Sequence, residues 1–434
     1  MTLSTQPYKG ARDFYPEDKR LQKYLFSTMR RVVESFGYEE YDAPILESLD
    51  LYTAKTGEEI VNEQTYVFKD RGGRSVVIRP EMTPSVSRMV AGRRQELGYP
   101  VRWYSIPNLW RYERPQRGRL REHWQLNVDI FGLAGLEAEH EAITVGASIL
   151  NAFGAKQSMY GIRINSRQLI NHFLNDILGL DAVQQLTTIK LIDRMHKMEH
   201  VAFVASIDAI LVPSQREAGV GERILGFLSA QSLAELPDDL RAHESTKKLI
   251  ALLAMLEESS VHNARFDATV MRGFDYYTDI VFEMFDTNPE NNRSMFGGGR
   301  YDGLVGLFGV EPVPTVGFGL GDVTLANFIE SHGLTPKLRS ETDVYAILVG
   351  DVYKKAQNVV SALREEGVRV AVDATGRKPA QQIKVALKKE IPYALFIGDK
   401  ELEEGRYTLK ELASSNEQML SVERIVSAVL DSRH

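Results

Sequence analysis

The sequence predicts an α+β fold, in which an antiparallel sheet flanked by helices carries a helical insertion and precedes a small C-terminal α/β domain. Three observations support this prediction. Strand-like runs joined by hairpin turns fill the first part of the chain, helical periodicity dominates residues 168–262, and strands alternate with helices after residue 343. Strands joined by hairpins pair antiparallel, whereas strands separated by helices build parallel sheets.

Length and composition limit the class of protein. The chain has 434 residues, a net charge of −7, 43% hydrophobic residues and no cysteine. At about 100–200 residues per domain, we expect several domains. The lack of cysteine excludes disulfides, thiolate zinc sites and a cysteine nucleophile, and it fits a reducing compartment. Because no run of about 18 apolar residues occurs and residues 1–20 carry no apolar signal region, we expect a cytoplasmic protein without a membrane span.

The boundaries of the expected domains follow changes in the pattern of residues. We expect one core built from residues 1–167 and 263–330, interrupted by a helical insertion at 168–262. A polar stretch at 331–342 predicts a linker, and residues 343–434 form the last domain.

The first core segment opens with an amphipathic helix at 19–36. The run at 38–46 contains a proline, which cannot donate to a β-ladder, so it predicts an edge strand. Strands at 65–68 and 75–78 flank a Gly-Gly turn at 70–74 and predict a hairpin.

Further elements are expected along the rest of the chain. In the core and insertion, strands are expected at 101–107, 125–132, 269–285 and 315–320, and a helix at 249–256. In the last domain, strands are expected at 344–349, 368–372 and 393–397, and helices at 354–366 and 378–389. The order of these last elements predicts a largely parallel sheet.

Five arginines lie between Arg111 and Arg121, in the segment that joins two expected strands. Guanidinium groups bind phosphate oxygens in bidentate, permanently charged contacts. Strand alternation places Arg111 and Glu113 on one face, ahead of a loop at 115–118. The cluster indicates a phosphate site, although a solvent-exposed basic hairpin would have the same composition.

A second constellation is Met-Arg-Gly-Phe-Asp-Tyr-Tyr-Thr at 271–278. If this segment is a strand, alternation places Arg272 and Tyr276 on one face and Tyr277 on the other. An arginine, an acid and paired tyrosines offer a charge clamp with flat polar walls. An ordinary core strand with tyrosines is the alternative.

Two other segments are ambiguous when each is taken alone. Three successive glycines at 297–299 fit neither the dinucleotide fingerprint nor a P-loop, and they predict a flexible turn. Glu81 and Thr83 follow an expected strand, where they could hold an ammonium group or form an ordinary salt-bridged turn. The nine histidines show no metal-ligand spacing, so we assign no metal site to protein side chains.

Together and in this order, these segments resemble the histidyl-tRNA synthetase family of class II aminoacyl-tRNA synthetases. The resemblance extends over nearly the whole chain and implies a class II synthetase-type antiparallel sheet. The matching segments are 9–16 (N-terminal segment), 36–47 (motif 1, the dimerisation strand), 111–132 (motif 2), 272–278 (the histidine-specific signature), 298–303 and 314–325 (motif 3), and 343–434 (anticodon-binding domain).

The resemblance implies a two-step reaction and its partners. L-Histidine and ATP would give histidyl-adenylate and pyrophosphate, and the histidyl group would then move to the 3′ end of tRNA(His). Magnesium would bridge the ATP phosphates, and the chain would act as a homodimer through motif 1. In-line attack of a carboxylate on the α-phosphorus needs mainly positioning and charge stabilisation, which suits a site rich in arginine.

The resemblance also implies roles for individual residues. For ATP, Arg111 would contact the α-phosphate, Glu113 the adenine amino group, and Arg119 the outer phosphates, with His123 beneath the adenine. The implied catalytic residues are Arg111 and Arg272, the latter neutralising the α-phosphate and the histidine carboxylate. The implied histidine-binding residues are Glu81, Thr83 and Gln125 at the α-amino group, Asp129, Tyr276, Tyr277 and Tyr301 at the imidazole, and Arg272.

The chain departs from the family pattern at three positions. Thr324 stands where motif 3 usually has an arginine on the adenine, His123 replaces a phenylalanine, and Asp129 replaces a more common glutamate. For Thr324, another arginine substitutes, ATP is held less tightly, or the ATP clamp differs.

The alternative function is that of a non-aminoacylating, histidine-binding paralogue, the regulatory subunit of ATP phosphoribosyltransferase. That paralogue usually lacks the anticodon-binding domain, much of motif 2 and the histidine-specific signature. This chain keeps all three.

Contact with tRNA is expected at two places. Residues 354–390 carry nine Lys/Arg against four Asp/Glu, a net charge of +5. The resemblance implies that Arg377 and Lys378 face anticodon-stem phosphates, although lysines on a helix usually form a solvated face. In motif 2, Gln116 and Arg117 would approach the acceptor end. The whole-chain charge therefore excludes only non-specific coating of nucleic acid.

Overall fold

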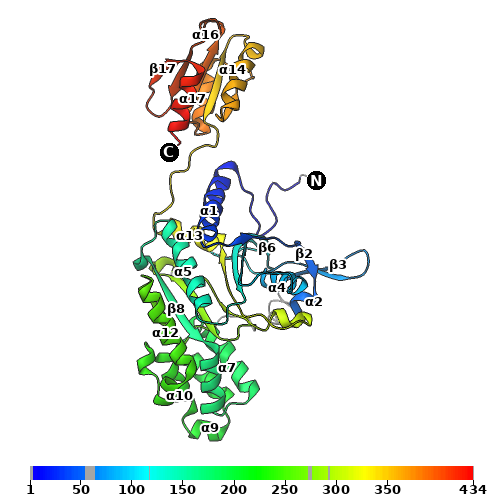
Figure 1. The fold of residues 1–434 in the computed structure, drawn as a ribbon, viewed down its shortest axis with the longest axis vertical. Helices are drawn as coiled ribbons and strands as arrows, with labels where there is room; N and C mark the ends of the chain where they lie inside the picture. Colours follow the sequence, from blue (N-terminus) through cyan, green and yellow to red (C-terminus); the bar gives the residue numbers. More distant parts are fainter. Residues whose placement is uncertain (1–2, 54–63, 117, 272–275, 292–293, 434) are drawn as a thin grey trace. The chain divides into compact units, whose positions relative to one another are not determined.

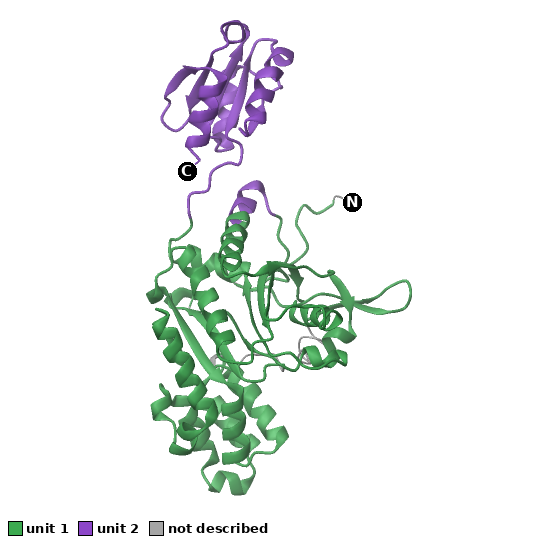
Figure 2. Cartoon of the chain, in the orientation of Figure 1, with its two compact units in different colours: residues 1–13, 22–335 green, residues 14–21, 336–434 purple. Residues whose placement is uncertain are grey.

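The structure is a computed structural model that describes residues 3–53, 64–116, 118–271, 276–291 and 294–433. Arg117 and Arg272 therefore lie outside the described residues. The chain divides into two compact units (Figure 2). Unit 1 comprises Met1–Asp13 and Gln22–Thr335, and unit 2 comprises Phe14–Leu21 and Pro336–His434.

Unit 1 is built on a large, mainly antiparallel sheet (Figure 1). Over the described residues its order is β1-β5-β7-β12-β11-β10-β8-β9, with β6 paired to β7. Among the described strand pairs of this sheet, only β1–β5 and β8–β9 are parallel, so the predicted antiparallel sheet is confirmed. The strands are β1 (Glu39–Glu40), β5 (Val101–Ser105), β6 (Asn108–Trp110), β7 (Glu122–Phe131), β8 (Tyr160–Ser166), β9 (Ala264–Phe266), β10 (Ile280–Asp286), β11 (Ser294–Arg300) and β12 (Thr315–Gly321).

Three helices cover one face of this sheet, and the candidate site lies on the other face. Helices α5 (Glu137–Ala152), α12 (Glu244–Glu258) and α13 (Asp322–Ser331) pack against the strands (Figure 1). A Cβ atom at Gly146 of α5 would lie 2.6 Å from the Cε atom of Met284, so the helix contacts the even-numbered side of β10. The odd-numbered side chains of the central strands therefore point to the opposite face.

A small sheet and three helices complete this part of the fold. Strands β2 (Leu46–Ser48), β4 (Ser75–Ile78) and β3 (Tyr66–Lys69) form a three-stranded antiparallel sheet, which confirms the predicted hairpin. The proline-containing run divides into β1 and β2, and β1 lies at an edge as predicted. The helices are α1 (Pro16–Ser35), α2 (Asp50–Thr53) and α4 (Thr83–Gly92).

The insertion between β8 and β9 is helical, as its periodicity predicts. Its interior includes Phe173 stacked on Phe227, with ring centroids 4.6 Å apart. Its helices are α6 (Arg167–Asn171), α7 (Ala182–Arg194), α8 (His200–Ile210), α9 (Pro213–Glu217), α10 (Val220–Ser229), α11 (Asp238–Ala242) and α12, and a π-helix follows α6 at His172–Ile177. The chain then returns to the sheet through β9, beside β8.

Two predictions about strands in unit 1 are wrong. Among the described residues of the strand expected at 269–285, strand structure begins at Ile280, and residues 276–279 form an irregular approach to it. The glycines at 297–299 lie inside β11 rather than in a flexible turn. They suit a strand here because β12 comes very close: a Cβ at Gly298 would lie 2.7 Å from the Cα of Phe318.

Unit 2 is a five-stranded α/β domain whose βαβαβ start matches the prediction. Its sheet has the order β14-β13-β15-β16-β17, parallel in its first three strands. The strands are β13 (Val344–Val349), β14 (Val370–Val372), β15 (Tyr393–Gly398), β16 (Tyr407–Glu411) and β17 (Glu417–Leu420), and the helices are α14 (Tyr353–Glu365), α15 (Pro379–Lys388), α16 (Asp399–Glu404) and α17 (Val422–Asp431). The antiparallel strands β16 and β17 were not predicted.

Both faces of the unit 2 sheet are buried, which explains the continuous apolar run of β13. Val344 and Ala346 pack on one side with α14 and α17, whereas Tyr345 and Ile347 pack on the other side with α15. In neither unit do the described residues include a helix with the length and apolar character needed to cross a bilayer.

Candidate active site

The centre of the candidate site is Asp129, on the face of β7 opposite to α5. Its side chain is buried, and Tyr301 donates a short hydrogen bond to Oδ1. The hydroxyl of Tyr41 donates to Oδ2 at 3.4 Å. Burial raises the pKa of Asp129 from 3.8 to about 7, against the lowering effect of the two hydroxyls. A ligand that brings an N–H donor would stabilise the charged form of this carboxylate.

Glycines of the neighbouring strands let the side chains around Asp129 lie directly against the sheet. Gly317 of β12 is directly opposite Asp129, and Gly299 of β11 is opposite Gly317. A Cβ at Gly317 would lie 2.6 Å from the Tyr301 hydroxyl, and one at Gly319 would lie 2.8 Å from Cδ of Gln125. A side chain at Gly317 or Gly319 would collide with Asp129, Tyr301 or Gln125, and we refer to these glycines as the glycine floor.

Three tyrosines lie together beside Asp129, and we refer to this cluster with Asp129 as the candidate pocket. The ring centroids of Tyr276 lie 4.9 Å from Tyr277 and 5.5 Å from Tyr301, and those of Tyr277 and Tyr301 lie 6.3 Å apart. All three side chains are buried. The prediction that strand alternation separates Tyr276 from Tyr277 is wrong, because both residues precede β10 and line the same space.

Glu81 joins the pocket from the segment between β4 and α4. The Tyr276 hydroxyl donates to Glu81 Oε2 at 3.1 Å, and the Tyr52 hydroxyl donates to the Glu81 carbonyl at 3.2 Å. Thr83 is the first residue of α4, two positions after this buried acid. On β7, Gln125 Nε2 donates to Asn127 Oδ1 at 2.8 Å, a pairing that sequence reasoning missed.

Arg111 lies just after β6, where Nε donates to the Pro80 carbonyl at 2.9 Å. This bond ties the arginine-rich segment to the segment that carries Glu81. Arg119 pairs with Glu113 at 3.8 Å, and Gln116 and Arg119 exchange two backbone hydrogen bonds of 2.9 Å that close the hairpin. Gln116 and Arg119 are exposed, whereas Arg111 and Glu113 are half-buried.

His123 lies on β7 opposite Leu109 of β6. Burial, with the guanidinium groups of Arg111 and Arg12, lowers the pKa of His123 to about 3. The imidazole is therefore neutral at physiological pH, and its ring presents an uncharged face.

Arg12 and Asp322 form a contact that the sequence did not reveal. Arg12 Nη2 donates to Asp322 Oδ2 at 2.8 Å, and the Trp124 backbone N–H donates to Oδ1 at 3.0 Å. The Arg12 guanidinium also lies 5.8 Å from the centroid of the Trp124 ring. Thr324, two residues after Asp322, uses its hydroxyl locally by donating to the carbonyls of Met295 at 3.0 Å and Gly321 at 3.1 Å. An arginine thus reaches the start of α13 from the N-terminal segment.

A sequence model of the histidyl-tRNA synthetase family matches residues 10–323, and a model of the anticodon-binding domain matches residues 343–432. The chain is 46% identical to a histidine–tRNA ligase of Leptospira biflexa, over 96% of this chain and 95% of that one. It is 36% identical to a histidine–tRNA ligase of Thermoplasma volcanium, over 98% of both chains. The chain belongs to the histidyl-tRNA synthetase family. The resemblance inferred from the sequence is thereby confirmed.

Solved structures support the same fold for this synthetase chain. The histidyl-tRNA synthetase of Nostoc sp. PCC 7120 matches with a TM-score of 0.82 and 22% identity, covering 99% of this chain and 100% of that one. A Bacillus halodurans structure described as an ATP phosphoribosyltransferase regulatory subunit/histidyl-tRNA synthetase matches with a TM-score of 0.73 and 21% identity, covering 92% of this chain and 100% of that one. At these sequence identities, the two structures are evidence for the fold alone.

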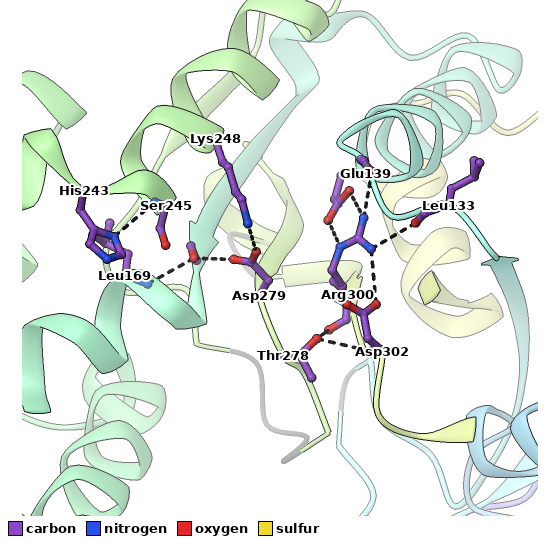
Figure 3. Close-up of polar contacts among 12 residues, drawn as sticks. Leu133, Glu139, Leu169, His243, Ser245, Lys248, Thr278, Asp279, Arg300 and Asp302 are labelled. Atoms are coloured by element: carbon purple, nitrogen blue, oxygen red, sulfur yellow. Dashed lines mark hydrogen bonds and ion pairs between the residues drawn. The ribbon is translucent and has the colours of Figure 1, made fainter. Parts of the chain in front are cut away.

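In this synthetase chain, an ion pair fixes the strand end that carries Tyr301 (Figure 3). Arg300 donates to both carboxylate oxygens of Glu139 at 2.6 and 2.7 Å, and both side chains are buried. It also donates to the carbonyls of Leu133 at 3.2 Å and Gly135 at 2.9 Å. Arg300 thereby holds the end of β11 against α5 while Tyr301 turns to the pocket.

The residues expected to contact tRNA lie in both units. Arg377 and Lys378 are exposed and come directly before α15 in unit 2, where the Gln382 side chain donates to the Arg377 carbonyl at 2.6 Å. On α15, Lys384 and Lys388 are also exposed. Gln116 lies in the arginine-rich hairpin of unit 1, so the two expected tRNA contacts belong to different units.

Proposed function

We propose that the chain is a histidine–tRNA ligase. It activates L-histidine with ATP to give histidyl-adenylate and pyrophosphate, and it then transfers the histidyl group to the 3′ end of tRNA(His). The observation that carries this proposal is the buried cluster of Asp129 and three tyrosines over the glycine floor, in a chain of the histidyl-tRNA synthetase family.

The pocket suits an imidazole for a specific chemical reason. An imidazole is flat and carries an N–H group, so it fits between aromatic walls and donates to a buried carboxylate. Asp129 would accept a hydrogen bond from that N–H group, while the hydroxyls of Tyr301 and Tyr41 keep the carboxylate in place. A flat side chain without an N–H would not supply this additional donor to Asp129, and a buried polar site discriminates strongly against such a ligand.

The other end of the amino acid would be held beside the pocket. Glu81, Thr83 and Gln125 would bind the α-ammonium group, with Glu81 held by Tyr276 at 3.1 Å. Arg272 would neutralise the histidine carboxylate and the α-phosphate as the carboxylate attacks. Because Arg272 lies outside the described residues, its role rests on the signature sequence.

For ATP, we propose contacts from the arginine-rich hairpin and β7. Arg111 would hold the α-phosphate, Glu113 the adenine amino group and Arg119 the outer phosphates, and the neutral His123 ring would lie beneath the adenine. Arg12 would supply the positive charge that Thr324 cannot, because Asp322 already orients its guanidinium.

Magnesium would bind chiefly through the ATP phosphates and water, where it would neutralise developing charge. Such binding does not require a protein cage. Among the described residues, no group of three or more His, Cys, Asp or Glu side chains is placed to hold a metal ion.

For tRNA, we propose that Gln116 and Arg117 approach the acceptor end and that Arg377 and Lys378 contact the anticodon arm. The exposed positions of Gln116, Arg377 and Lys378 support this assignment. We also propose that the enzyme acts in the cytoplasm, where charged tRNA is used.

We further propose a homodimer. Ile45, Leu46, Val67 and Phe68 are 47%, 46%, 46% and 43% exposed, although they are large apolar residues on or beside the small sheet. Exposed apolar groups at adjacent positions favour a protein interface. Ile45 and Leu46 fall in the motif 1 segment, where a two-fold contact would bury them.

The test is histidine-dependent ATP–pyrophosphate exchange followed by charging of a tRNA(His) transcript. Both activities are expected from the purified protein. Histidine binding without exchange or charging would instead favour the regulatory paralogue, the function also named for the Bacillus halodurans structure. The presence of the anticodon-binding domain and the complete arginine-rich hairpin supports the synthetase.

A further inference from the structure

The root of the helical insertion holds a carboxylate that the proposed chemistry does not use (Figure 3). Asp279 comes two residues after Tyr277 and directly before β10, and its side chain is only 6% exposed. Its carboxylate accepts a hydrogen bond from Ser166 Oγ at 2.7 Å and forms an ion pair with Lys248 Nζ at 3.1 Å. Its backbone carbonyl accepts the N–H of Arg167 at 3.0 Å.

These partners come from both ends of the insertion. Ser166 caps α6, the first helix of the insertion, by accepting the Leu169 N–H at 3.3 Å. Lys248 projects from α12, the last helix, whose buried Leu249 and Leu252 anchor it against the rest of unit 1. The two ends of the insertion therefore meet at a single carboxylate.

The insertion root also holds the other side of the histidine-specific segment. Arg167 Nη1 donates to the Met271 carbonyl at 3.0 Å, and Asn165 Nδ2 donates to the Val270 carbonyl at 3.2 Å. Met271 precedes residues 272–278 and Asp279 follows them. The insertion root therefore contacts the chain on both sides of that segment. The core sheet makes a separate contact at the C-terminal end of the segment, because the Thr278 N–H donates to the Arg300 carbonyl at 2.8 Å.

The charges around Lys248 indicate that its ammonium group neutralises the buried carboxylate of Asp279. Lysines on helices usually form a solvated face, and Lys247 is exposed in this way. The insertion as a whole is acidic, with eight Lys/Arg against 13 Asp/Glu at 168–262, a net charge of −5. Lys248 is 37% exposed and directs its ammonium group at Asp279. A buried carboxylate needs such a partner, because an unpaired buried charge is strongly unfavourable.

We propose that Lys248 is a positioning residue of the histidine pocket, acting through Asp279 to fix Tyr276 and Tyr277 and so coupling the helical insertion to histidine binding. The inference rests on the proposed function, because the pocket is taken to hold histidine. Tyr277 lies against the glycine floor, where a Cβ at Gly299 would be 3.0 Å from its ring, so a small shift of the segment would change the pocket. By linkage, histidine in the pocket would also stabilise the insertion root.

The test compares Lys248→Met with Lys247→Met, the neighbouring exposed lysine on the same helix. The Kd for histidine by calorimetry and the KM for histidine in pyrophosphate exchange are expected to rise about tenfold in Lys248→Met, the size typical of contacting pairs. The KM for ATP should change less than twofold. Lys247→Met should resemble the wild type, and Lys248→Arg, which keeps the charge, should recover most of the affinity.

Two further measurements separate positioning from a general loss of structure. If Lys248 acts through Asp279, the double variant with Asp279→Asn binds histidine no more weakly than Lys248→Met alone. Hydrogen exchange in α12 should slow when histidine is added to the wild type but not to Lys248→Met. Unchanged histidine affinity in Lys248→Met, or equal losses for histidine and ATP, would overturn the inference. Absence of exchange in a wild type that still binds histidine would instead count against the proposed function, while calorimetry would still test the coupling.

Discussion

Replacing Asp129 by asparagine should make the empty protein more stable at alkaline pH while it weakens histidine binding. Burial raises the pKa of Asp129 from 3.8 to about 7. The folded state therefore keeps a proton that the unfolded chain releases, and the wild type loses stability as pH rises from about 4 to 7. The difference between the two pKa values corresponds to about 4 kcal/mol at pH 8. Asparagine carries no charge, so the variant should not show this loss.

The assay can follow unit 1 alone, because all three tryptophans (Trp103, Trp110 and Trp124) lie in it. Urea unfolding followed by tryptophan fluorescence should give equal midpoints for Asp129→Asn and wild type near pH 4. The variant should then become the more stable protein by pH 8. An exposed control, Asp193→Asn, should follow the wild type at every pH.

The same substitution should raise the KM for histidine in pyrophosphate exchange. A hydrogen bond to a charged group contributes about 1.5–3 kcal/mol, so the expected loss is roughly tenfold to 150-fold. The reasoning would be refuted by an Asp129→Asn variant that parallels the wild type in stability from pH 4 to 8, or that binds histidine normally.

Three other substitutions test separate parts of the site. Gly317→Ala should abolish measurable histidine binding, because its Cβ would lie 2.6 Å from the Tyr301 hydroxyl, whereas Gly303→Ala, with no heavy atom within 4 Å, should bind normally in the same calorimetric titration. Arg12→Met should raise the KM for ATP about tenfold in pyrophosphate exchange and leave the KM for histidine unchanged; an unchanged KM for ATP would remove Arg12 from the ATP site. Arg377→Glu should weaken tRNA binding in a filter assay without changing exchange, and equal loss of both activities would contradict its assignment to the anticodon arm.

The fold was predictable wherever the pattern of residues is local. The hairpin of β3 and β4 follows from a Gly-Gly turn between two short apolar runs, and the start of unit 2 follows from alternating strand and helix periods. The insertion was predictable because the sequence pattern changes from strand-like runs to helical periodicity. β6 was not predicted, because its three residues, Asn108–Trp110, are too few to show an alternation of polar and apolar side chains.

The site was only partly predictable, since its shape depends on contacts between distant strands. The tyrosines were predicted as pocket residues, but their shared direction was not, because it depends on β10 starting at Ile280. The glycines of β11 resembled a turn because nothing local reveals that β12 approaches closely enough to exclude a side chain at Gly298. Arg12 and Asp322 are separated by 310 positions, so no spacing rule could pair them.

Arg12 and Lys248 follow the same physical logic. Each reaches a carboxylate at the edge of a site segment, Asp322 before Thr324 and Asp279 after Tyr277, and the two acids are only 4% and 6% exposed. A buried carboxylate requires a cation, and that cation can come from any part of the chain that folding brings near. Removal of either cation alone therefore leaves a buried charge beside the site. Removal of the cation together with its carboxylate leaves none, so the paired substitutions should disturb the site less than the single ones.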